Sequence, residues 1–543
     1  MSASPAALLE VQAQRWSAQP LFILPQSVAA MWGLPQNVWT YAEAVKTVRT
    51  LRDAYRAAGY GSGHRVALLL ENRPAHFLHW LALNGLGVSV VPVNPDYSRD
   101  EAAYLLSHSG AVLAVALPER LAQIDGLGVP VIADGTPPPT VARVEPGTGE
   151  CALIYTSGTT GKPKGCLLSD AYFMGWADWY LAQGGQIALR PGQERLITPL
   201  PSFHVNAMGN SFMGMLASGG AQVIVDRFHP RSWWTNVRET GATCCHYLGV
   251  MPAILLALPE GPDERAHGLR FGLGGGVHPD HHAAFEARFG LPLLEGWAMT
   301  ESGGACLLAA VDAPRHVGQR CLGKPSRPGP AMEARIVDEA GNTSPAGTPG
   351  ELVVRAAGAD PRRGLFSGYL NDAQATAEIW RGGWLHTGDI MRQDADGSLF
   401  FVDRLKNIIR RSGENISALE VEGAIAAHPG VSQVAVVAVP DPIRDEEVLA
   451  VVVPKDASNE AALAQEIFDH AARSLAYYKL PAFVAFADSL PTTSTQKIRK
   501  AELGTLAEDP VSHPRCHDLR TRKKSRRRRG DMPSTTNGFV DAS

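Results

Sequence analysis

Short apolar runs and segments of helical periodicity alternate along the first 400 residues of this 543-residue chain. Residues 65–70 are expected to form a strand, residues 74–86 a helix and residues 88–93 the next strand. These strand segments are apolar at nearly every position, which is typical of parallel strands that helices cover on both faces. The alternation therefore predicts an α/β fold built from parallel sheets flanked by helices.

The pattern changes after residue 331 and again near residue 404. Strand-like segments with few helices between them continue to residue 402, which predicts a β-rich subdomain. A chain of this length exceeds what one hydrophobic core can hold, so two or more domains are expected. We predict an N-terminal domain over residues 1–403 and a small α+β domain over residues 404–509.

Charge is distributed unevenly along the chain. The net charge is −4, but residues 510–543 contain nine Lys or Arg against three Asp, which leaves −10 on residues 1–509. A body this acidic argues against nucleic acid as a specific partner. The charge density of residues 510–543 predicts a basic disordered tail, and attraction to polyanions is the alternative to a tail without function.

The cysteine pattern and the apolar stretches indicate the cellular compartment of the protein. The seven cysteines form no C-x-x-C pair, so neither a disulfide framework nor a zinc site is expected. The first 15 residues lack a basic segment followed by an apolar core, so no secretory signal is expected. The longest apolar stretch, residues 80–93, is too short to span a bilayer. These features predict a reduced, cytoplasmic protein without a transmembrane segment.

A loop rich in glycine and hydroxyl residues follows the expected strand at residues 151–155. Backbone N–H groups, hydroxyls and lysines in such a loop are suited to binding a polyphosphate. Two residues separate its glycines where the Walker pattern needs four, so a standard P-loop is not expected. The alternative is a flexible turn. The candidate phosphate-binding residues are Thr156, Ser157, Gly158, Thr159, Thr160, Gly161, Lys162 and Lys164.

A second glycine cluster stands at the end of another expected strand, where the backbone can approach a flat ligand closely. It consists of Gly274, Gly275 and Gly276. In this order, the two motifs resemble those of the adenylate-forming superfamily, which includes acyl-CoA synthetases, luciferases and peptide-synthetase adenylation domains. The resemblance covers residues 10 to 505.

This resemblance implies the position of the nucleotide and its metal. Adenine is expected beside the glycine cluster and Trp297, which stands where the family usually has tyrosine. Thr300 is expected beside the α-phosphate, and Glu301 is expected to bind Mg²⁺. One carboxylate suits Mg²⁺, because this ion shares phosphate oxygens and keeps several waters.

The resemblance continues into the C-terminal part of the chain. Asp389 is expected to accept hydrogen bonds from the ribose hydroxyls, with Arg404 nearby. Lys406 occupies the hinge position, so the C-terminal domain is expected to be mobile. Gly413 is expected to let the narrow arm of a thiol carrier pass during thioester formation. Without the resemblance, Asp389 would be interpreted as a turn residue. The charged residues Arg404 and Lys406 would be interpreted as members of solvated ion pairs at the surface.

Two further site residues follow from the resemblance. Lys497 is the expected catalytic lysine, because a cation can bridge the carboxylate and the triphosphate that adenylation brings together. Its neighbour Gln496 stands where the family usually has glycine, and is expected to affect the rate more than the reaction class. His204 is expected to line the acyl pocket, and the alternative is a partly buried histidine held by hydrogen bonds.

The implied activity is a two-step acid–thiol ligation. A carboxylate attacks the α-phosphate of Mg-ATP, and coenzyme A then displaces AMP from the acyl-adenylate. ATP, Mg²⁺ and coenzyme A are therefore the expected cofactors, and a small-molecule carboxylic acid is the expected partner. Segments at 245–249, 411–417 and 441–446 are similar to the carnitine/crotonobetaine-CoA ligase branch, which implies a short acid bearing a quaternary ammonium.

Several alternatives stay open at this point. A medium-chain or aryl acid is the second substrate class. The enzyme could instead load a separate carrier protein, or the chain could be a non-catalytic nucleotide-binding relative. A homo-oligomer is also left open. Five tryptophans could form an aromatic face for a cation, or could pack in the core: Trp176, Trp179, Trp233, Trp234 and Trp297.

Overall fold

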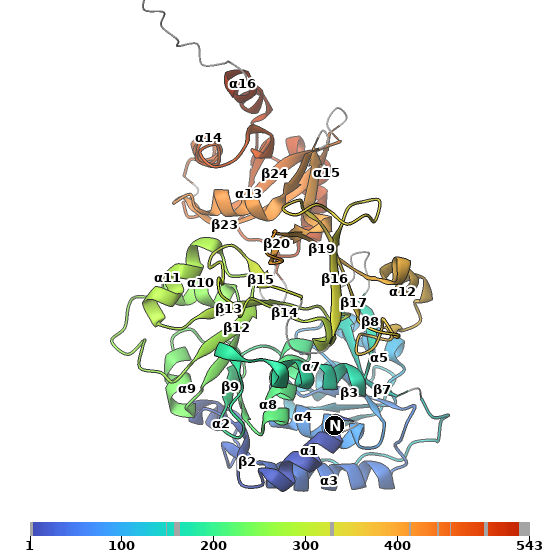
Figure 1. Ribbon diagram of the computed structural model, residues 1–543. Coiled ribbons are helices and arrows are strands. Elements are labelled where there is room, and N and C mark those ends of the chain that lie inside the picture. Colours follow the sequence, from blue (N-terminus) through green and yellow to red (C-terminus); the bar gives the residue numbers. More distant parts are fainter. Residues whose placement is uncertain are drawn as a thin grey trace, which may run out of the picture. The chain divides into compact units, whose positions relative to one another are not determined.

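The computed structural model describes residues 4–147, 149–156, 163–325, 331–411, 414–441, 445–456, 458–492 and 498–530. The chain forms two compact units, which are described separately below. The first contains Met1–Thr387 and Arg392–Phe400, and the second contains Gly388–Met391 and Phe401–Ser543. Parallel sheets covered by helices confirm the predicted α/β class (Figure 1).

The first unit contains an eight-stranded sheet whose central neighbours run parallel. Only its two edge pairs, β1–β2 and β13–β14, are antiparallel. In spatial order the strands are β14 (Leu308–Ala309), β13 (Leu293–Trp297), β12 (Phe271–Gly275), β11 (Cys244–Leu248), β9 (Arg195–Thr198), β10 (Ala221–Ile224), β1 (Pro20–Ile23) and β2 (Val38–Thr40).

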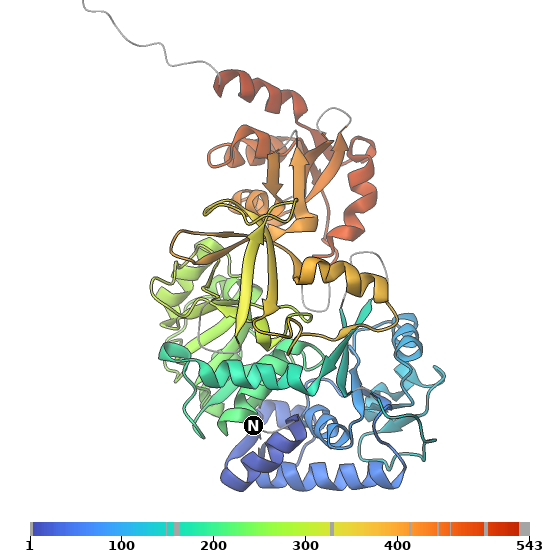
Figure 2. The same cartoon turned by 45° about the vertical axis from the view of Figure 1, so that its right-hand side comes forward.

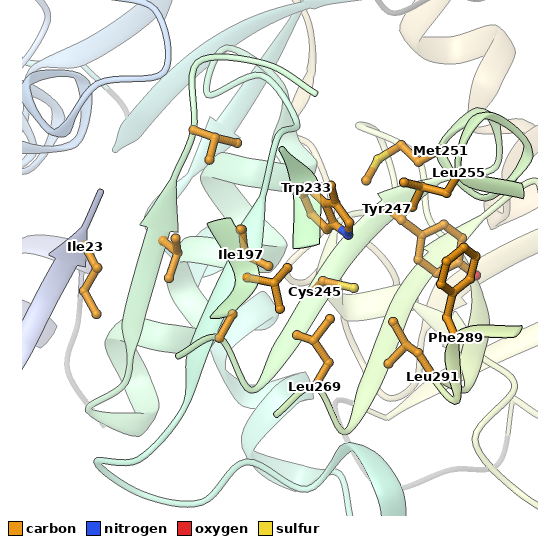
Figure 3. Close-up of a cluster of buried hydrophobic side chains, with 14 of the residues drawn as sticks. Ile23, Ile197, Trp233, Cys245, Tyr247, Met251, Leu255, Leu269, Phe289 and Leu291 are labelled. Atoms are coloured by element: carbon orange, nitrogen blue, oxygen red, sulfur yellow. The ribbon is translucent and has the colours of Figure 1, made fainter. Parts of the chain in front are cut away.

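One face of this sheet carries a large apolar core (Figure 3). Strand residues such as Cys245 and Tyr247 pack there against Trp233, Met251 and Phe289 from the covering helices. Burial of these large side chains fixes the helices on the sheet. The helices are α2 (Gln26–Met31), α9 (Trp233–Thr240), α10 (Val250–Ala257) and α11 (Pro279–Phe289).

A second, seven-stranded sheet has a parallel centre and an antiparallel edge. Its core includes Ala102, Leu105 and Leu106 from the helix α5 (Arg99–Ser109), together with Ile124 of α6 (Leu121–Ile124). In spatial order its strands are β18 (Gly368–Tyr369), β8 (Lys164–Ser169), β7 (Glu150–Thr156), β4 (Ser89–Pro92), β3 (Arg65–Leu69), β5 (Leu113–Ala116) and β6 (Val131–Ala133).

Further helices of the first unit pack against one another beside these sheets. The α4 segment is apolar on nearly all sides and is buried along its whole length, as expected of a central helix. Beside it, α1 and α3 lie side by side near the N-terminus (Figure 2). These helices are α1 (Pro5–Arg15), α3 (Tyr41–Ala57), α4 (Pro74–Asn84), α7 (Asp170–Ala182) and α8 (Phe212–Ser218).

The predicted β-rich region forms a five-stranded sheet of the first unit. Its strands β19 and β20 also carry the chain between the two units, close to the boundary expected at residue 403. A short helix, α12 (Ala373–Ile379), follows β18. In spatial order the strands are β15 (Cys321–Gly323), β20 (Leu399–Arg404), β19 (Leu385–Gln393), β17 (Gly350–Ala356) and β16 (Met332–Val337).

The second unit is an α+β structure around a six-stranded sheet, in which β23 pairs with β24 beside the path β22–β21–β24–β25–β26. Apolar side chains of β24 and of α13 and α14 form its core. The elements are β21 (Ile408–Arg411), β22 (Glu414–Ser417), α13 (Ala418–Ala426), β23 (Val431–Asp441), β24 (Asp445–Pro454), α14 (Glu460–Ala471), β25 (Phe483–Phe486), α15 (Gly504–Glu508), β26 (Cys516–Asp518) and α16 (Arg520–Gly530).

The residues after 509 differ from the expected disordered tail as far as residue 530. Strand β26 pairs antiparallel with β25, so it extends the sheet of the second unit. Leu519 is buried in the core of that unit, and its N–H donates to the carbonyl of Ala482 at 2.8 Å. Composition suggested disorder because few residues here are apolar, but one buried leucine and the edge of a sheet hold the segment. Residues 531–543 lie outside the described part of the chain.

Within the described ranges, no helix is both long enough and apolar enough to cross a membrane. The cysteines are free thiols, and all except the half-buried Cys516 are buried.

Candidate active site

The predicted phosphate loop connects two antiparallel strands of the first unit, β7 and β8. Thr156 at the end of β7 pairs with Lys164 at the start of β8. The hairpin therefore brings the two ends of the loop together. The remaining predicted loop residues lie outside the described part of the chain: Ser157, Gly158, Thr159, Thr160, Gly161 and Lys162.

Glu301, the predicted metal ligand, lies beside this hairpin. The hydroxyl of Tyr369 donates to Glu301 Oε1 at 2.7 Å, and the Cys166 thiol lies 3.8 Å from the same oxygen. Lys164 Nζ lies 5.1 Å from the centre of the Tyr369 ring and 3.6 Å from Asp372 Oδ2. The fold therefore brings Lys164, Tyr369 and Glu301 close together.

Tyr369 is held in its donor form. Burial raises the pKa of its hydroxyl, and the charge of Glu301 raises this pKa further. The hydroxyl therefore stays protonated and keeps one carboxylate oxygen of Glu301 oriented. No cluster of three or more His, Cys, Asp or Glu suited to a metal occurs among the described residues. A single carboxylate at this position fits Mg²⁺ that is held mainly by phosphate and water, as it commonly is in nucleotide sites.

The glycine cluster ends strand β12 and turns sharply. An added Cβ at Gly274 would lie 2.2 Å from the carbonyl oxygen of Tyr247, so no side chain fits there. Gly276 has a φ of +82°, which glycine adopts without strain. Glu295 of the neighbouring strand accepts hydrogen bonds at 3.1 Å from the N–H groups of Gly276 and Val277. This buried carboxylate fixes the turn.

Trp297 and Thr300 follow on the next strand and turn. Trp297 ends β13, which runs parallel beside β12, and its side chain is largely buried. The carbonyl of Thr300 accepts a hydrogen bond from the Tyr172 hydroxyl at 2.8 Å. The ends of β12 and β13 therefore lie at one edge of the sheet, where ligands of α/β proteins usually bind.

His204 precedes an unusual helical turn. Its carbonyl accepts a hydrogen bond from Met208 N at 3.1 Å, and residues 206–211 form a π-helix that continues into α8. π-Helical turns often occur at functional sites. Asn210, on this turn, is 5% exposed, and its Oδ1 has no hydrogen-bond partner within the described part of the chain.

A buried polar network lies against the same turn. His246 of β11 is fully buried, and its Nε2 lies 2.6 Å from the Tyr180 hydroxyl. Its Nδ1 lies 2.7 Å from Ser211 Oγ and 3.3 Å from Asn206 Oδ1. Burial lowers the pKa of His246 to about 3, so the ring is neutral at physiological pH. Polar groups of α7 and β11 thus contact the turn after His204, while Phe212 of α8 packs against Phe77 and Trp80.

The five tryptophans do not form one aromatic face. Trp233 packs in the core of the large sheet, and Trp234 stacks on His267 with ring centres 5.0 Å apart. Trp179 donates to the carbonyl of Leu307 at 3.1 Å. Trp176 is buried against the π-helical turn, where an added Cβ at Gly209 would lie 2.7 Å from its Nε1. Packing therefore accounts for these four side chains.

The second unit holds the remaining described site residues. Asp389 is fully buried, and Arg404 Nε lies 2.7 Å from its Oδ1. Asp403 accepts hydrogen bonds at 2.8 Å from the Ser417 hydroxyl and from Leu419 N, which anchors the start of α13. The predicted hinge residue Lys406 lies on a short 3₁₀ turn, Leu405–Asn407. Gly413 and Lys497 lie outside the described part of the chain.

Three residues were missed by the sequence analysis: Tyr172, Glu295 and Tyr369. Tyr369 donates to a carboxylate 68 positions away, and no local pattern announces such a contact. The sequence contained a weak indication for Glu295, because a carboxylate among apolar strand residues needs a hydrogen-bond partner when it is buried.

Comparisons with known proteins agree with this geometry. The family profile described as AMP-binding enzyme matches residues 10–370, and the profile of the AMP-binding enzyme C-terminal domain matches residues 420–497. A crotonobetaine/carnitine–CoA ligase of Citrobacter koseri is 32% identical over 86% of this chain and 93% of the relative. A sulfoacetate–CoA ligase of Cupriavidus necator is 32% identical over 92% of this chain and 97% of the relative.

Among solved structures, ATP-bound MatB from Rhodopseudomonas palustris superposes with a TM-score of 0.78. It is 24% identical and covers 94% of this chain and all of its own. An identity this low supports a similarity of fold alone.

The chain belongs to the adenylate-forming family of AMP-binding enzymes. The predicted resemblance is thereby confirmed, and so is the predicted class, an acyl-CoA synthetase that uses ATP and coenzyme A and acts through an acyl-adenylate.

Proposed function

We propose that this acyl-CoA synthetase activates a short, polar carboxylic acid, with an acid bearing a quaternary ammonium as the first candidate. The observation that carries the proposal is the polar network of His246, Tyr180 and Ser211 behind the helix that follows His204. Polar side chains close to an acyl site favour a polar acid, because a polar group left without a hydrogen-bond partner against hydrocarbon costs free energy.

Close packing of the same helix supports a short substrate. An added Cβ at Gly214 would lie 2.6 Å from the Tyr180 ring, and one at Gly209 would lie against Trp176. Aromatic side chains thus already occupy the space between α7 and α8. We infer that a polar acid is oriented toward the His204 ring and toward Asn210 Oδ1, which has no hydrogen-bond partner among the described residues. The two relatives named above carry the names of short polar acids.

We assign the other site residues to the two steps as follows. Thr156, Lys164 and the loop between them bind the phosphates, and Glu301 holds Mg²⁺ when the ion is bound. Gly274–Gly276 and Trp297 hold adenine, and Thr300 lies near the α-phosphate. Asp389 binds the ribose beside Arg404, and the ion pair with Arg404 keeps its carboxylate oriented.

The remaining assignments concern the change between the steps. Lys497 bridges the reacting anions during adenylation, and Lys406 is the hinge about which the second unit moves. Gly413 lines the path of the coenzyme A arm. We further propose that the enzyme is cytoplasmic, which its free, mostly buried cysteines support.

A panel of acids tests the substrate class. Release of AMP and pyrophosphate would be measured with carnitine-like, sulfonated, dicarboxylic, medium-chain and aryl acids, with and without coenzyme A, and products identified by mass spectrometry. We expect an acyl-CoA product with short polar acids, at kcat/KM about 100-fold above that for a medium-chain acid. A preference for medium-chain or aryl acids would overturn the proposal. Pyrophosphate release without any CoA thioester would instead favour a separate carrier protein.

Tyr369→Phe tests how Glu301 is oriented. The variant removes one hydroxyl and keeps the ring that Lys164 approaches. We expect the Mg²⁺ concentration for half-maximal adenylation to rise about tenfold, since partners that orient a metal ligand commonly matter to this extent. The matched control is Tyr477→Phe on the second unit, which should change nothing. An unchanged Mg²⁺ dependence in Tyr369→Phe would remove the positioning role.

A further inference from the structure

A buried carboxylate in the second unit contacts two cationic side chains, and neither has a role in the reaction described so far. Glu447 of β24 is 2% exposed. Arg411 Nε lies 2.8 Å from its Oε1, and Lys523 Nζ lies 2.7 Å from its Oε2. Both cations are buried as well, at 6% exposed for Arg411 and 3% for Lys523. Each oxygen of the carboxylate is therefore held by a different cation.

This group of three charges is stable only as a unit. Burial raises the pKa of Glu447, but the hydrogen bond from Arg411 and the charge of Lys523 outweigh it, so this pKa lies below its ordinary value. The carboxylate thus stays ionised. A lysine is almost never buried to this degree unless it is paired, so its position indicates a specific contact rather than a solvated surface charge.

The two cations lie in separate parts of the chain, one before and one after the region that matches the family's C-terminal domain. Lys523 lies on α16, beyond residue 497, where the match to the family's C-terminal domain ends. Strand β26 and the buried Leu519 attach this extension to the sheet. The Arg522 guanidinium on the same helix pairs with Asp469 of α14 at the surface. The extension is therefore docked on the second unit by β26, Leu519 and the buried ion pair, whereas the Arg522 pair lies exposed at the surface.

Arg411 stands at the other end of this connection. It is the last residue of β21, and in the register of the sheet its backbone lies opposite residue 414 of β22 and residue 445 of β24. Residues 412 and 413 connect β21 to β22, so Arg411 is two residues from Gly413. The base of the hairpin that carries Gly413 is thus tied, through Glu447, to the helix of the C-terminal extension.

We propose that the extension of residues 510–530 is a brace for the hairpin Ile408–Ser417, and that Lys523 is a positioning residue for the thioester step. Held at Oε2 by Lys523, the Glu447 carboxylate presents Oε1 to Arg411 in one orientation. Without Lys523 the carboxylate can rotate, and the strand end that leads to Gly413 loses a fixed anchor. The inference rests on the proposed role of Gly413 in passing the coenzyme A arm.

The test compares the two half-reactions in the full-length protein. Lys523→Met removes the charge and keeps most of the side-chain length. We expect adenylation, measured as pyrophosphate release without coenzyme A, to stay within about twofold of wild type. Conversion of supplied acyl-adenylate to acyl-CoA should fall about tenfold, because small displacements of a positioning element have effects of this size or larger. Lys523→Arg should restore most of the rate.

Arg522, the neighbour of Lys523 on the same helix, provides a matched control. Arg522→Met removes an exposed ion pair of the same helix and should leave both half-reactions unchanged. Equal losses in both half-reactions for Lys523→Met, or no loss in either, would overturn the brace. If Lys523→Met fails to fold, Glu447→Gln should show the same selective loss, with faster amide exchange over residues 408–417 than in β23.

Gly413→Leu separates this inference from the role on which it rests. If Gly413→Leu blocks thioester formation and Lys523→Met does not slow it, the role of Gly413 stands and the brace fails. If Gly413→Leu leaves thioester formation intact, the proposed role of the hairpin fails instead.

Discussion

Replacing Lys497 with alanine should strongly slow adenylation while sparing the second half-reaction. Adenylation brings a carboxylate and a triphosphate together, and a cation between them stabilises the charge that develops. Loss of one such group commonly lowers kcat by about 10²–10³-fold. On either side of Lys497 in the sequence, Thr492 and Ile498 form a β-bridge, and Arg499 N donates to the Pro491 carbonyl at 2.8 Å. The substitution should therefore leave the fold intact.

The measurement is the rate of pyrophosphate release with the preferred acid, beside the rate of acyl-CoA formation from supplied acyl-adenylate. Lys479→Ala is a suitable control, because Lys479 makes a surface ion pair with Glu420 in the same unit. It should leave both rates near those of the wild type. If Lys497→Ala lowered both half-reactions equally, the assigned role would be wrong. Gln496→Gly would then show whether the unusual neighbour limits the rate.

Glu301→Gln should lower adenylation by about 10²–10³-fold and raise the Mg²⁺ requirement. Glutamine keeps the shape of the side chain and an oxygen that can accept the hydrogen bond from Tyr369. What it loses is the negative charge that would hold the metal beside the phosphates. Thioester formation from supplied acyl-adenylate should change little, because the pyrophosphate has already left.

The Mg²⁺ titration of the adenylation rate checks this expectation. Glu333→Gln serves as the control, since Glu333 pairs with Arg355 on the β-rich sheet. Thermal unfolding should show that both variants are folded. A Mg²⁺ dependence of Glu301→Gln that matched wild type would mean that Glu301 is not a metal ligand.

The family could be predicted from the sequence, because the candidate site residues stand in short motifs whose order identifies it. The strand before Thr156 and the glycines at 274–276 were recognisable from local composition, and β7 and β12 lie where they were expected. Parallel strands need continuous apolar runs, and close backbone approach needs glycine, so local sequence is informative for both.

The segment after residue 509 shows where composition gave a wrong prediction. Its charge density predicted disorder, but β26 and α16 form because the edge of β25 accepts another strand and Glu447 accepts a buried lysine. Composition records how much apolar surface a segment can bury by itself. It does not record an ion pair or a strand partner that the rest of the fold supplies.

The family and the reaction class were therefore accessible from the residues alone, since both depend on motifs within contiguous segments. Contacts between distant segments depend on the folded chain: the hydroxyl of Tyr369 on Glu301, the polar groups around His246, and Lys523 on Glu447. In each case a buried charged or polar group had to find a partner far along the chain. Burial makes such a group costly when it is unpaired, so the tertiary structure determines which partner it meets.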